Sequence, residues 1–375
     1  MDKLGIYIHI PFCIKKCNYC DFCSYPGSDT ARMEAYTKEL CLRIEQFADG
    51  LEQKRTVDTV YFGGGTPSLL PTECFERLMD TLRVRFDIED GAEITAECNP
   101  VTIDKKGFGE LRRIGINRIS LGMQSANDNE LKALGRLHSF RELKKAFEDA
   151  RAAGFDNISV DLMYGIPEQT VESFEKTLRE VCTLAPEHVS AYGLKIEDGT
   201  AFAACRDRLA LPDEDAEFEM YCRCCGILGE SGYRRYEISN FAKDGYASRH
   251  NLRYWSLRDY VGFGVAAYSC FEGERYGNSR DIKAFLDGED ITEERYTVTP
   301  RERVNEYVML GLRLEEGIDT AVYRKLTGRE FKAEHPQVDG YVDAGFLWEQ
   351  DGRIGFTTKG FFVSNSILSE MLDFE

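Results

Sequence analysis

Between residue 5 and about residue 195, β-rich runs alternate with amphipathic helical patterns, and this rhythm limits the possible folds more than any other feature. Strands separated by helix-length connections favour a parallel sheet. We therefore expect an α/β fold, a partial TIM-like (β/α)6 barrel. The predicted strands are Gly5–Ile10, Val57–Phe62, Glu93–Glu97, Arg118–Leu121, Asn157–Met163 and His188–Leu194. The predicted helices lie near Arg32–Phe47, Thr72–Arg85, Ile103–Arg113, Phe140–Ala153 and Val171–Leu184.

The rhythm changes after residue 200. A helical stretch at Asp213–Glu230 leads to YRRYEISNFA and SRHNLRYW. The small-residue segment 262–270 is a candidate to return to the barrel. From Arg301 onward the pattern is helix, turn, helix and a two-stranded wing, which predicts a smaller α+β, winged-helix-like C-terminal region. We predict three domains: the barrel at 1–200, an extension at 201–300 and the C-terminal domain at 301–375.

Composition excludes several classes of protein. The net charge is −18, which argues against binding to a nucleic-acid backbone, a DNA-binding wing included. A local basic pocket stays possible, and its candidates are Lys15, Lys16, Arg112, Arg113 and Arg118. No apolar run reaches the roughly 18 residues of a membrane span, and the short apolar N-terminus does not read as a signal peptide. The 13 cysteines fit a reducing compartment better than a disulfide framework, so we expect a cytoplasmic protein.

Cys13, Cys17 and Cys20 form a C-x3-C-x2-C loop directly after the first predicted strand. A [4Fe–4S] cluster normally takes four cysteine ligands, so three thiolates on one loop would leave one iron open. An open coordination position distinguishes a catalytic metal site from a closed structural one. The loop therefore predicts a reactive iron–sulfur cluster.

Two other interpretations of the loop stay open. Cys23 extends the pattern to C-x3-C-x2-C-x2-C, which would close around one zinc ion and make a structural or DNA-binding metalloprotein. The thiols could also be buried packing groups, which we favour for Cys23 itself and for Cys222, Cys224 and Cys225 in a predicted helix.

Polar and glycine residues gather where predicted strands end, and in a barrel of parallel strands these ends meet at one face. Gly63–Ser68 follows the second strand, and its glycines allow a ligand close to the backbone. The phosphate-loop pattern is absent. Four polar residues near other strand ends or the loops after them would line one cavity for a small cofactor: Glu97, Gln124, Arg136 and Asp161.

His250 lies in the stretch RHNLRYW, among aromatic and hydrogen-bonding residues. A single histidine is more often structural than a ligand, although imidazole is a common axial ligand of haem iron. Both interpretations of His250 stay open on the residues alone.

Taken together, these stretches resemble the radical S-adenosylmethionine (SAM) superfamily, in particular its HemN-related branch. The cysteine loop matches the cluster signature of the superfamily. The branch likeness extends from residue 5 to about 270, and MLGLRLEEGI and FTTKGF extend it further. The matching stretches are YIHIPFCIKKCNYCDF, YFGGGTPS, ITAECNP, RISLGMQS, LGRLHS, DLMYGIPEQT, YEISNFA and SRHNLRYW.

The resemblance implies a set of cofactors and roles. A [4Fe–4S] cluster would be held by Cys13, Cys17 and Cys20, and SAM would chelate its open iron. One-electron reduction would cleave SAM to a 5′-deoxyadenosyl radical, so the cofactor carries the difficult chemistry. A low-potential donor such as flavodoxin or ferredoxin would supply the electron. The residues implied to surround SAM are Tyr7, Tyr19, Gly64, Gly65, Thr66, Glu97, Gln124, Arg136 and Asp161.

The branch contains two functional outcomes. Coproporphyrinogen III dehydrogenases decarboxylate two propionates of a porphyrinogen in porphyrin biosynthesis, whereas haem chaperones bind haem and pass it to acceptor proteins. The dehydrogenases carry C-x3-C-x2-C-x-C, but this chain has Phe22 at the position of the last cysteine, and only 12 residues precede Cys13. The resemblance therefore favours a haem chaperone, with His250 as its haem ligand, over an oxidoreductase.

Overall fold

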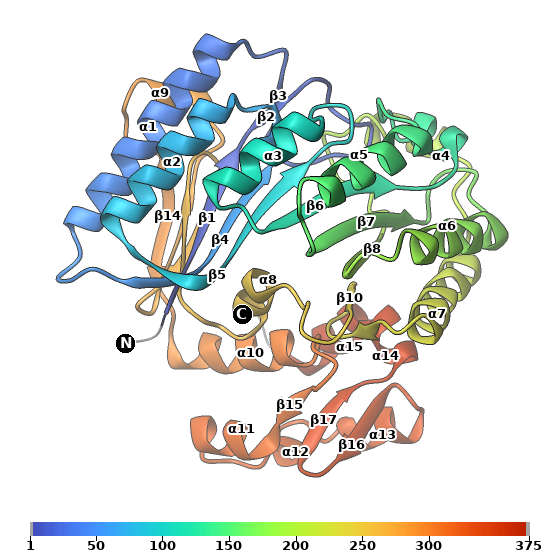
Figure 1. Cartoon of the computed structure of the whole chain (residues 1–375). Coiled ribbons are helices and arrows are strands. Elements are labelled where there is room, and N and C mark those ends of the chain that lie inside the picture. The colour runs from blue at the N-terminus through green and yellow to red at the C-terminus, as the bar shows by residue number, and fades with distance from the viewer. Residues whose placement is uncertain (1–2, 373–375) are drawn as a thin grey trace.

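The computed structural model describes residues 3–372 and contains one large, mostly parallel sheet (Figure 1). Its centre is a run of parallel strands in chain order, as the sequence predicted. The sheet continues at both edges and its ends do not pair with each other, so the barrel is partial. The central strands are β1 (Leu4–Ile10), β4 (Thr56–Gly64), β5 (Asp87–Cys98), β6 (Arg118–Gln124), β7 (Ile158–Tyr164) and β8 (His188–Gly193).

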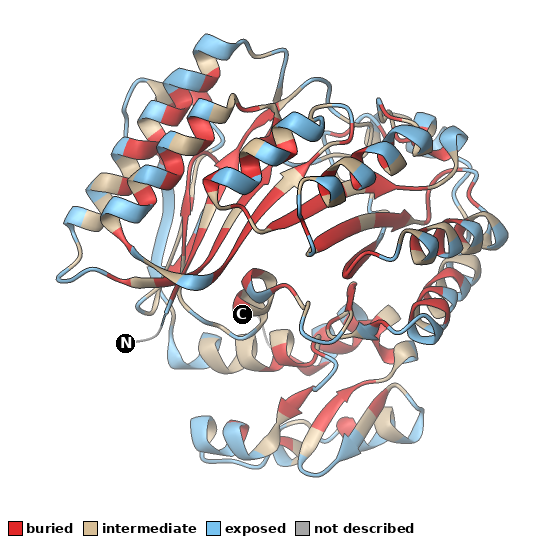
Figure 2. Cartoon of the chain, in the orientation of Figure 1, coloured by how far each residue is buried: buried red, intermediate tan, exposed pale blue. Residues whose placement is uncertain are grey.

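The predicted helices also form, and they cover the outer face of the sheet (Figure 1). Figure 2 shows their pattern: the sides that face the strands are buried and the outer sides are exposed. This follows from apolar residues repeating at helical spacing. The helices are α1 (Thr30–Asp49), α2 (Thr72–Arg85), α3 (Lys105–Ile114), α5 (Phe140–Ala152) and α6 (Val171–Leu184), with a short α4 (Asp128–Ala133) that the sequence prediction missed.

The edges of the sheet are built by residues beyond 230. Strand β11 (Tyr260–Phe263) pairs in parallel with β1, so the small-residue segment does return to the barrel. Antiparallel strands continue that edge: β12 (Tyr268–Phe271), β13 (Glu274–Asn278) and β14 (Thr292–Thr297). At the other edge β10 (Asn240–Ala242) joins β8, and β9 (Arg234–Arg235) follows. These additions were not predicted as strands.

The helix α8 (Arg249–Trp255) carries the HNLRYW stretch and lies against the strands near the end where they begin (Figure 1). Its Arg253 is buried and donates hydrogen bonds to the carbonyls of Lys3 and Asp259, 2.8 and 3.0 Å away, and to the carboxylate of Asp58. The backbone amides of Arg249 and His250 donate to the carboxylate of Glu93 on β5. These bonds fix α8 as the base of the barrel.

The C-terminal region has its own buried cluster, which includes Val308, Ile354 and Phe361. A three-stranded antiparallel sheet and short helices form it, in agreement with the predicted winged-helix-like region. The long helix α7 (Glu214–Glu230) reaches this cluster through Tyr221. The sheet consists of β15 (Ile318–Asp319), β17 (Arg353–Phe356) and β16 (Leu347–Gln350), and the helices are α10 (Pro300–Gly311), α11 (Thr320–Thr327), α12 (Phe331–Glu334), α13 (Val338–Asp343), α14 (Thr358–Phe362) and α15 (Ser364–Met371).

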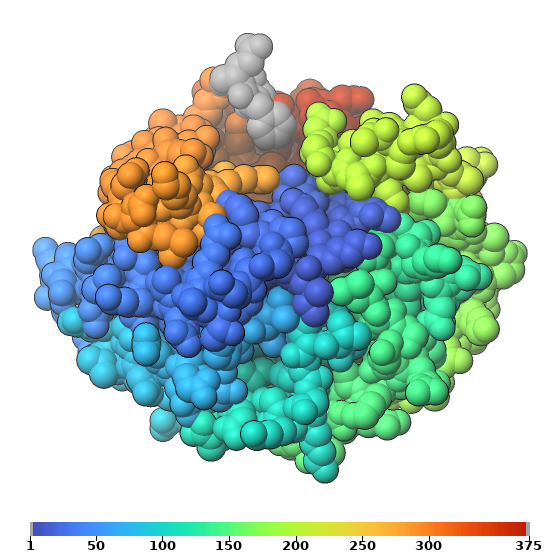
Figure 3. All heavy atoms as spheres, turned by 90° about the horizontal axis from the view of Figure 1, so that it is seen from above, coloured from blue at the N-terminus to red at the C-terminus, as the bar shows by residue number. Residues whose placement is uncertain are grey.

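Within residues 3–372, no helix combines the length and the apolar character that crossing a bilayer requires. Seen from above, the blue N-terminal segment lies between the orange residues of the sheet's added edge and the green strands and helices of the barrel (Figure 3).

Candidate functional site

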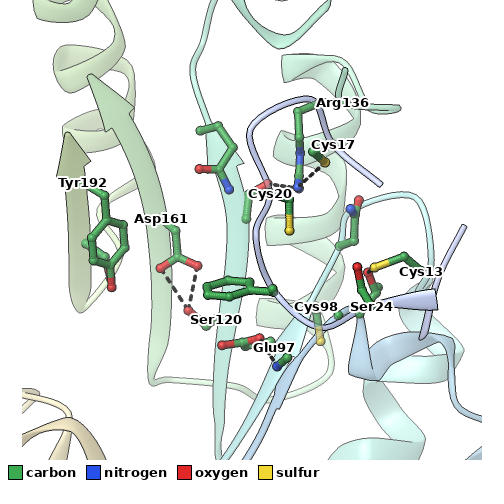
Figure 4. A pocket seen from close by; sticks show the side chains of 18 of the residues that line it. Cys13, Cys17, Cys20, Ser24, Glu97, Cys98, Ser120, Arg136, Asp161 and Tyr192 are labelled. Atoms are coloured by element: carbon green, nitrogen blue, oxygen red, sulfur yellow. Dashed lines mark hydrogen bonds between the residues drawn. The ribbon is translucent and has the colours of Figure 1, made fainter. Parts of the chain in front are cut away.

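A cavity of about 340 Å³ opens where the barrel strands end, beneath the cysteine loop. Figure 4 shows the three loop cysteines on one side of it, and Asp161 and Tyr192 on the other. Every residue that the sequence predicted for the cluster and SAM lines this cavity except Tyr7. The parallel register explains this, because residues at the ends of neighbouring strands lie at one face.

The three cysteines have different environments. Cys13 lies in β2 (Phe12–Cys13), with its Sγ 3.4 Å from Thr66 Oγ1, and Cys17 Sγ accepts a hydrogen bond from Arg136 at 3.6 Å. Burial raises the pKa of Cys13, and it raises that of Cys20 to about 11. In the metal-free protein these two groups are therefore protonated thiols at neutral pH, and a bound metal would reverse this preference.

His9 connects β1 to the cysteine loop. Its Nε2 lies 2.9 Å from the carbonyl oxygen of Cys23, and its Nδ1 lies 3.0 Å from the hydroxyl of Tyr7. Burial lowers the pKa of His9 to about 4, so the ring is neutral at pH 7. Since a carbonyl only accepts, Nε2 carries the proton and Nδ1 accepts from Tyr7. His9 thereby holds the end of the loop.

The glycines at the end of β4, Gly64 and the Gly65 that follows it, lie close to the loop because they have no side chains. Gly64 has φ of +113°, which favours glycine. A Cβ there would lie 2.6 Å from the ring of His9. A Cβ on Gly65 would lie 2.7 Å from the carbonyl oxygen of Phe12 and 3.1 Å from Cys13 Sγ. The turn therefore needs glycine at both positions.

Glu97 lies one residue before the end of β5 and lines the cavity. Its carboxylate accepts hydrogen bonds from the hydroxyl of Tyr61 at 2.9 Å and the amide of Gly64 at 3.1 Å. Burial, and then the charge of Asp161, raise the pKa of Glu97 to about 7. Glu97 therefore carries a proton part of the time at neutral pH, which is typical of functional sites.

Asp161, Arg136 and Gln124 line the same cavity. Ser120 donates to the carboxylate of Asp161 at 3.1 Å, and burial raises the pKa of that group. Arg136 donates to the carbonyl of Gly122 at 2.8 Å, and its buried Nε has no partner among residues 3–372. Gln124 has φ of +67°, a conformation that is costly for residues other than glycine and concentrates at functional sites.

Cys23 lies apart from the other three loop cysteines. It is buried in the main core, and its Sγ lies 3.7 Å from the hydroxyl of Tyr25 and 3.9 Å from the carbonyl of Arg280. It does not line the cavity. In the described part of the chain, no three His, Cys, Asp or Glu side chains converge as a single metal ion would require. This geometry supports the packing interpretation of Cys23 and gives no support to a closed zinc site.

Two of the predicted residues lie outside the cavity. Tyr7 stacks against Tyr61 and bonds to His9, so it supports the site from behind. His250 is 1 % exposed, with Nδ1 2.9 Å from Thr59 Oγ1 and Nε2 2.7 Å from the hydroxyl of Tyr254. Because both ring nitrogens are bonded, the described conformation does not present His250 to an iron atom. Its neighbour Asn251 faces the cavity instead.

Sequence reasoning missed several lining residues, and it placed others wrongly. Among the basic candidates Lys15, Lys16 and Arg118 line the cavity, whereas Arg112 and Arg113 lie exposed on α3. The alternation of side chains along a strand could have indicated the missed strand residues, since inward positions recur every second residue. The lining residues not singled out as site residues include Tyr61, Cys98, Arg118, Ser120, Ser190, Tyr192 and Asn251.

Comparison with known proteins identifies the class of this fold and site. Residues 7–181 match the model of the radical SAM superfamily, and residues 298–363 match that of the HemN C-terminal domain. The first match spans the cysteine loop and most of the barrel strands. It confirms that the chain is a radical SAM protein.

Relatives that match over their full length identify the family within the radical SAM proteins. The chain is 34 % identical to "Heme chaperone HemW" of Haemophilus influenzae, over 99 % of this chain and 98 % of that protein. It is 35 % identical to the protein of the same name from Escherichia coli, over 99 % of each. The chain therefore belongs to the HemW family of radical SAM proteins.

A solved structure supports the fold. Coproporphyrinogen III oxidase (HemN) from Escherichia coli, described as a radical SAM enzyme, is 25 % identical and superposes with a TM-score of 0.86. The likeness covers 98 % of this chain and 89 % of that one. The partial barrel and the C-terminal region are thus shared with that enzyme.

Membership of the superfamily brings its two cofactors, a [4Fe–4S] cluster and SAM, and the described residues fit both. The three cysteines are free thiols that face one cavity. A cluster binds each cysteine through a different iron, so the sulfurs need not converge on one point. The side-chain-free turn at Gly64 and Gly65 and the unpartnered Nε of Arg136 fit a polar ligand beside the loop.

Proposed function

We propose that this protein is a haem chaperone, which binds haem and transfers it to acceptor proteins. The observation that carries the proposal is the similarity to HemW proteins over the whole chain, including the C-terminal region. Phe22 adds support, because it stands 66 % exposed beside the cluster loop where the dehydrogenase pattern has a cysteine.

We propose that Cys13, Cys17 and Cys20 hold the cluster and that the cavity beneath holds SAM. When bound, these groups supply one-electron chemistry. The protein's residues bind and orient them: the Gly64–Thr66 turn lies along one wall, and Arg136 holds positive charge beside Cys17. The other predicted SAM residues are Tyr19, Glu97, Gln124 and Asp161, with Tyr7 as a support behind them.

We propose that a low-potential donor protein, such as flavodoxin or ferredoxin, reduces the cluster. Ile14, Lys15 and Lys16 are exposed on the cluster loop of this otherwise acidic chain, and this local positive charge suits an acidic partner. The free thiols of the chain favour a reducing compartment, so we place the protein in the cytoplasm as part of the same proposal.

His250 stays our predicted haem ligand, provided that its two ring nitrogens can be released from their present hydrogen bonds. The imidazole is neutral, as iron ligation requires, because burial lowers the pKa of His250 to about 3. Its bonds to Thr59 and Tyr254 must break before either nitrogen reaches iron. We therefore expect haem ligation by His250 to require local opening of α8.

The test is a haem titration of the anaerobically reconstituted protein. We expect a saturable change in the Soret band. His250→Ala should weaken binding at least roughly tenfold, whereas His188→Ala, which removes another buried histidine with both nitrogens bonded, should not. No saturable change in the wild-type protein contradicts the haem proposal. Equal binding by His250→Ala contradicts only the ligand assignment.

The likeness to HemN favours one alternative function, coproporphyrinogen III dehydrogenase. Incubation with coproporphyrinogen III, SAM and a low-potential reductant separates the two. We expect no divinyl product, and product formed at catalytic turnover would replace the chaperone proposal by the dehydrogenase.

A further inference from the structure

Arg118 is a buried cation at the base of the cavity. It lies on β6 and is 2 % exposed, yet it lines the cavity. The register aligns Tyr7, Tyr61, Thr95 and Arg118 across four neighbouring strands. This row lies one inward position before Glu97 and Ser120, so Arg118 is deeper in the barrel than the residues at the strand ends.

Its guanidinium lacks the partners that a buried charge needs. Among residues 3–372 no side-chain hydrogen bond or ion pair of Arg118 is found, and its Nε is buried without a partner. Arg253 is equally buried but bonds to two carbonyls and to Asp58. Because an unpaired buried charge is costly, Arg118 is arranged for a partner that the protein does not supply.

The neighbouring acids do not fill this role. The charge of Arg118 acts on both Glu97 and Asp161, but neither forms an ion pair with it. Glu97 is held by Tyr61 and Gly64, and Asp161 by Ser120. His188 and His250 are neutral, because burial and then the charge of nearby arginines, Arg118 included, lower the pKa of both.

Asn251 supplies a second polar group in the same cavity. It comes from α8 at the base of the barrel. Within the described chain its side-chain amide forms no hydrogen bond, whereas its backbone amide donates to Ser248 Oγ at 3.4 Å. A guanidinium and a free amide lining one cavity can bind an acceptor group between them.

The partner that best suits the Arg118 guanidinium is a carboxylate. The planar guanidinium fork matches the two oxygens of a carboxylate. A phosphate would bring about twice that charge near Glu97 and Asp161, which disfavours it. We propose that Arg118, assisted by Asn251, binds a carboxylate of a ligand in this cavity.

Two ligand carboxylates are candidates for this site: the methionyl carboxylate of SAM and a propionate of haem. The second source rests on the proposed chaperone function, and the first rests only on the family. An experiment with paired ligands separates them, because decarboxylated SAM lacks the carboxylate group and haem dimethyl ester has both propionates neutralised as esters.

The test measures equilibrium binding by anaerobically reconstituted protein of SAM against decarboxylated SAM, and of haem against haem dimethyl ester. For Arg118→Gln we expect a loss of roughly ten- to a hundredfold for the carboxylate-bearing member of one pair. The analogue of that pair should change less than about twofold. Arg118→Lys, which keeps the charge but not the fork, should lose less.

Arg55→Gln is the control for removing a buried arginine that does not line the cavity, and we expect it to lower the melting temperature without separating either pair. A selective loss for SAM assigns the cofactor carboxylate, and a selective loss for haem assigns a propionate. Equal losses for both members of each pair, or no loss, overturn the proposal. If Arg118→Gln does not fold, Arg118→Lys decides by the same criterion. If wild-type protein binds no haem, the chaperone proposal fails while the SAM pair still tests Arg118.

Discussion

At the scale of single residues, the site contains ionisable side chains that are buried, and burial makes their charged forms costly. Glu97, Asp161 and Arg118 lie in one cavity, and within residues 3–372 only Glu97 and Asp161 bond to neighbouring side chains or amides. The sequence predicted Glu97 and Asp161 from their places near strand ends. It named Arg118 only as a candidate for a basic pocket and could not predict its depth, because that depth follows from the strand register. It also could not predict that Thr59 and Tyr254 bond to both ring nitrogens of His250.

Glu97 should make stability depend on pH. Its pKa of about 7 in the folded protein exceeds the ordinary value of 4.5, so the folded protein holds a proton that the unfolded chain releases. Stability therefore falls as pH rises from about 4.5 to about 7. Glu97→Gln cannot ionise, so we expect it to exceed the metal-free wild type by up to about 3 kcal/mol at pH 8, with little difference at pH 5.

Urea unfolding of both proteins at the two pH values measures this effect. Glu293→Gln, at an exposed position of β14, should match the wild type at both. A Glu97→Gln difference that is the same at pH 5 and pH 8 would show that the buried carboxylate is not its cause.

At the scale of elements, the sequence predicted the strands and helices whose pattern is regular and missed those whose role is tertiary. β4 and α2 follow clear apolar periodicity, and their predicted bounds are close to the observed ones. The short β10 and β11 gain their strand character from pairing with β8 and β1. Such long-range pairing leaves little signal in a local window.

The link from β1 to the cysteine loop through His9 can be tested by removing it. His9→Ala loses the bonds to Tyr7 and to the carbonyl of Cys23, so the loop has fewer fixed positions. We expect the iron bound per folded protein after anaerobic reconstitution to fall to roughly half or less, since a site held loosely binds metal more weakly. His188→Ala removes a buried histidine at the start of β8 and should leave the iron content unchanged. Full iron content in His9→Ala would contradict a positioning role.

At the scale of the whole molecule, the described residues contain three buried apolar clusters, and the two larger ones support different parts of the chain. The largest packs the helices against the outer face of the barrel sheet, and the second forms the core of the C-terminal region. The predicted division into three domains at residues 200 and 300 stays a prediction. Strand β11 and helix α8 show how far residues beyond 200 contribute to the barrel itself.

The stability of the C-terminal apolar core should be separable from iron binding at the cysteine loop. Ile354 is fully buried on β17, so Ile354→Ala should cost the C-terminal region about 2 to 5 kcal/mol. We expect calorimetry to detect a lower transition temperature, with unchanged iron content per folded protein. Val322→Ala, at an exposed position, is the matched control. Loss of iron in Ile354→Ala would show that the two regions are coupled more strongly than their separate cores suggest.

The position of α8 has a consequence for synthesis on the ribosome. Asn251, at the base of the cavity, lies 231 positions after Cys20. At roughly 5 to 20 residues per second, translation leaves an interval of roughly ten to fifty seconds between the two. Through that interval the nascent loop has its thiols but no completed chamber beneath them. Its vulnerability to oxidation is therefore greatest before the chain is released, when no finished protein yet exists to receive its iron.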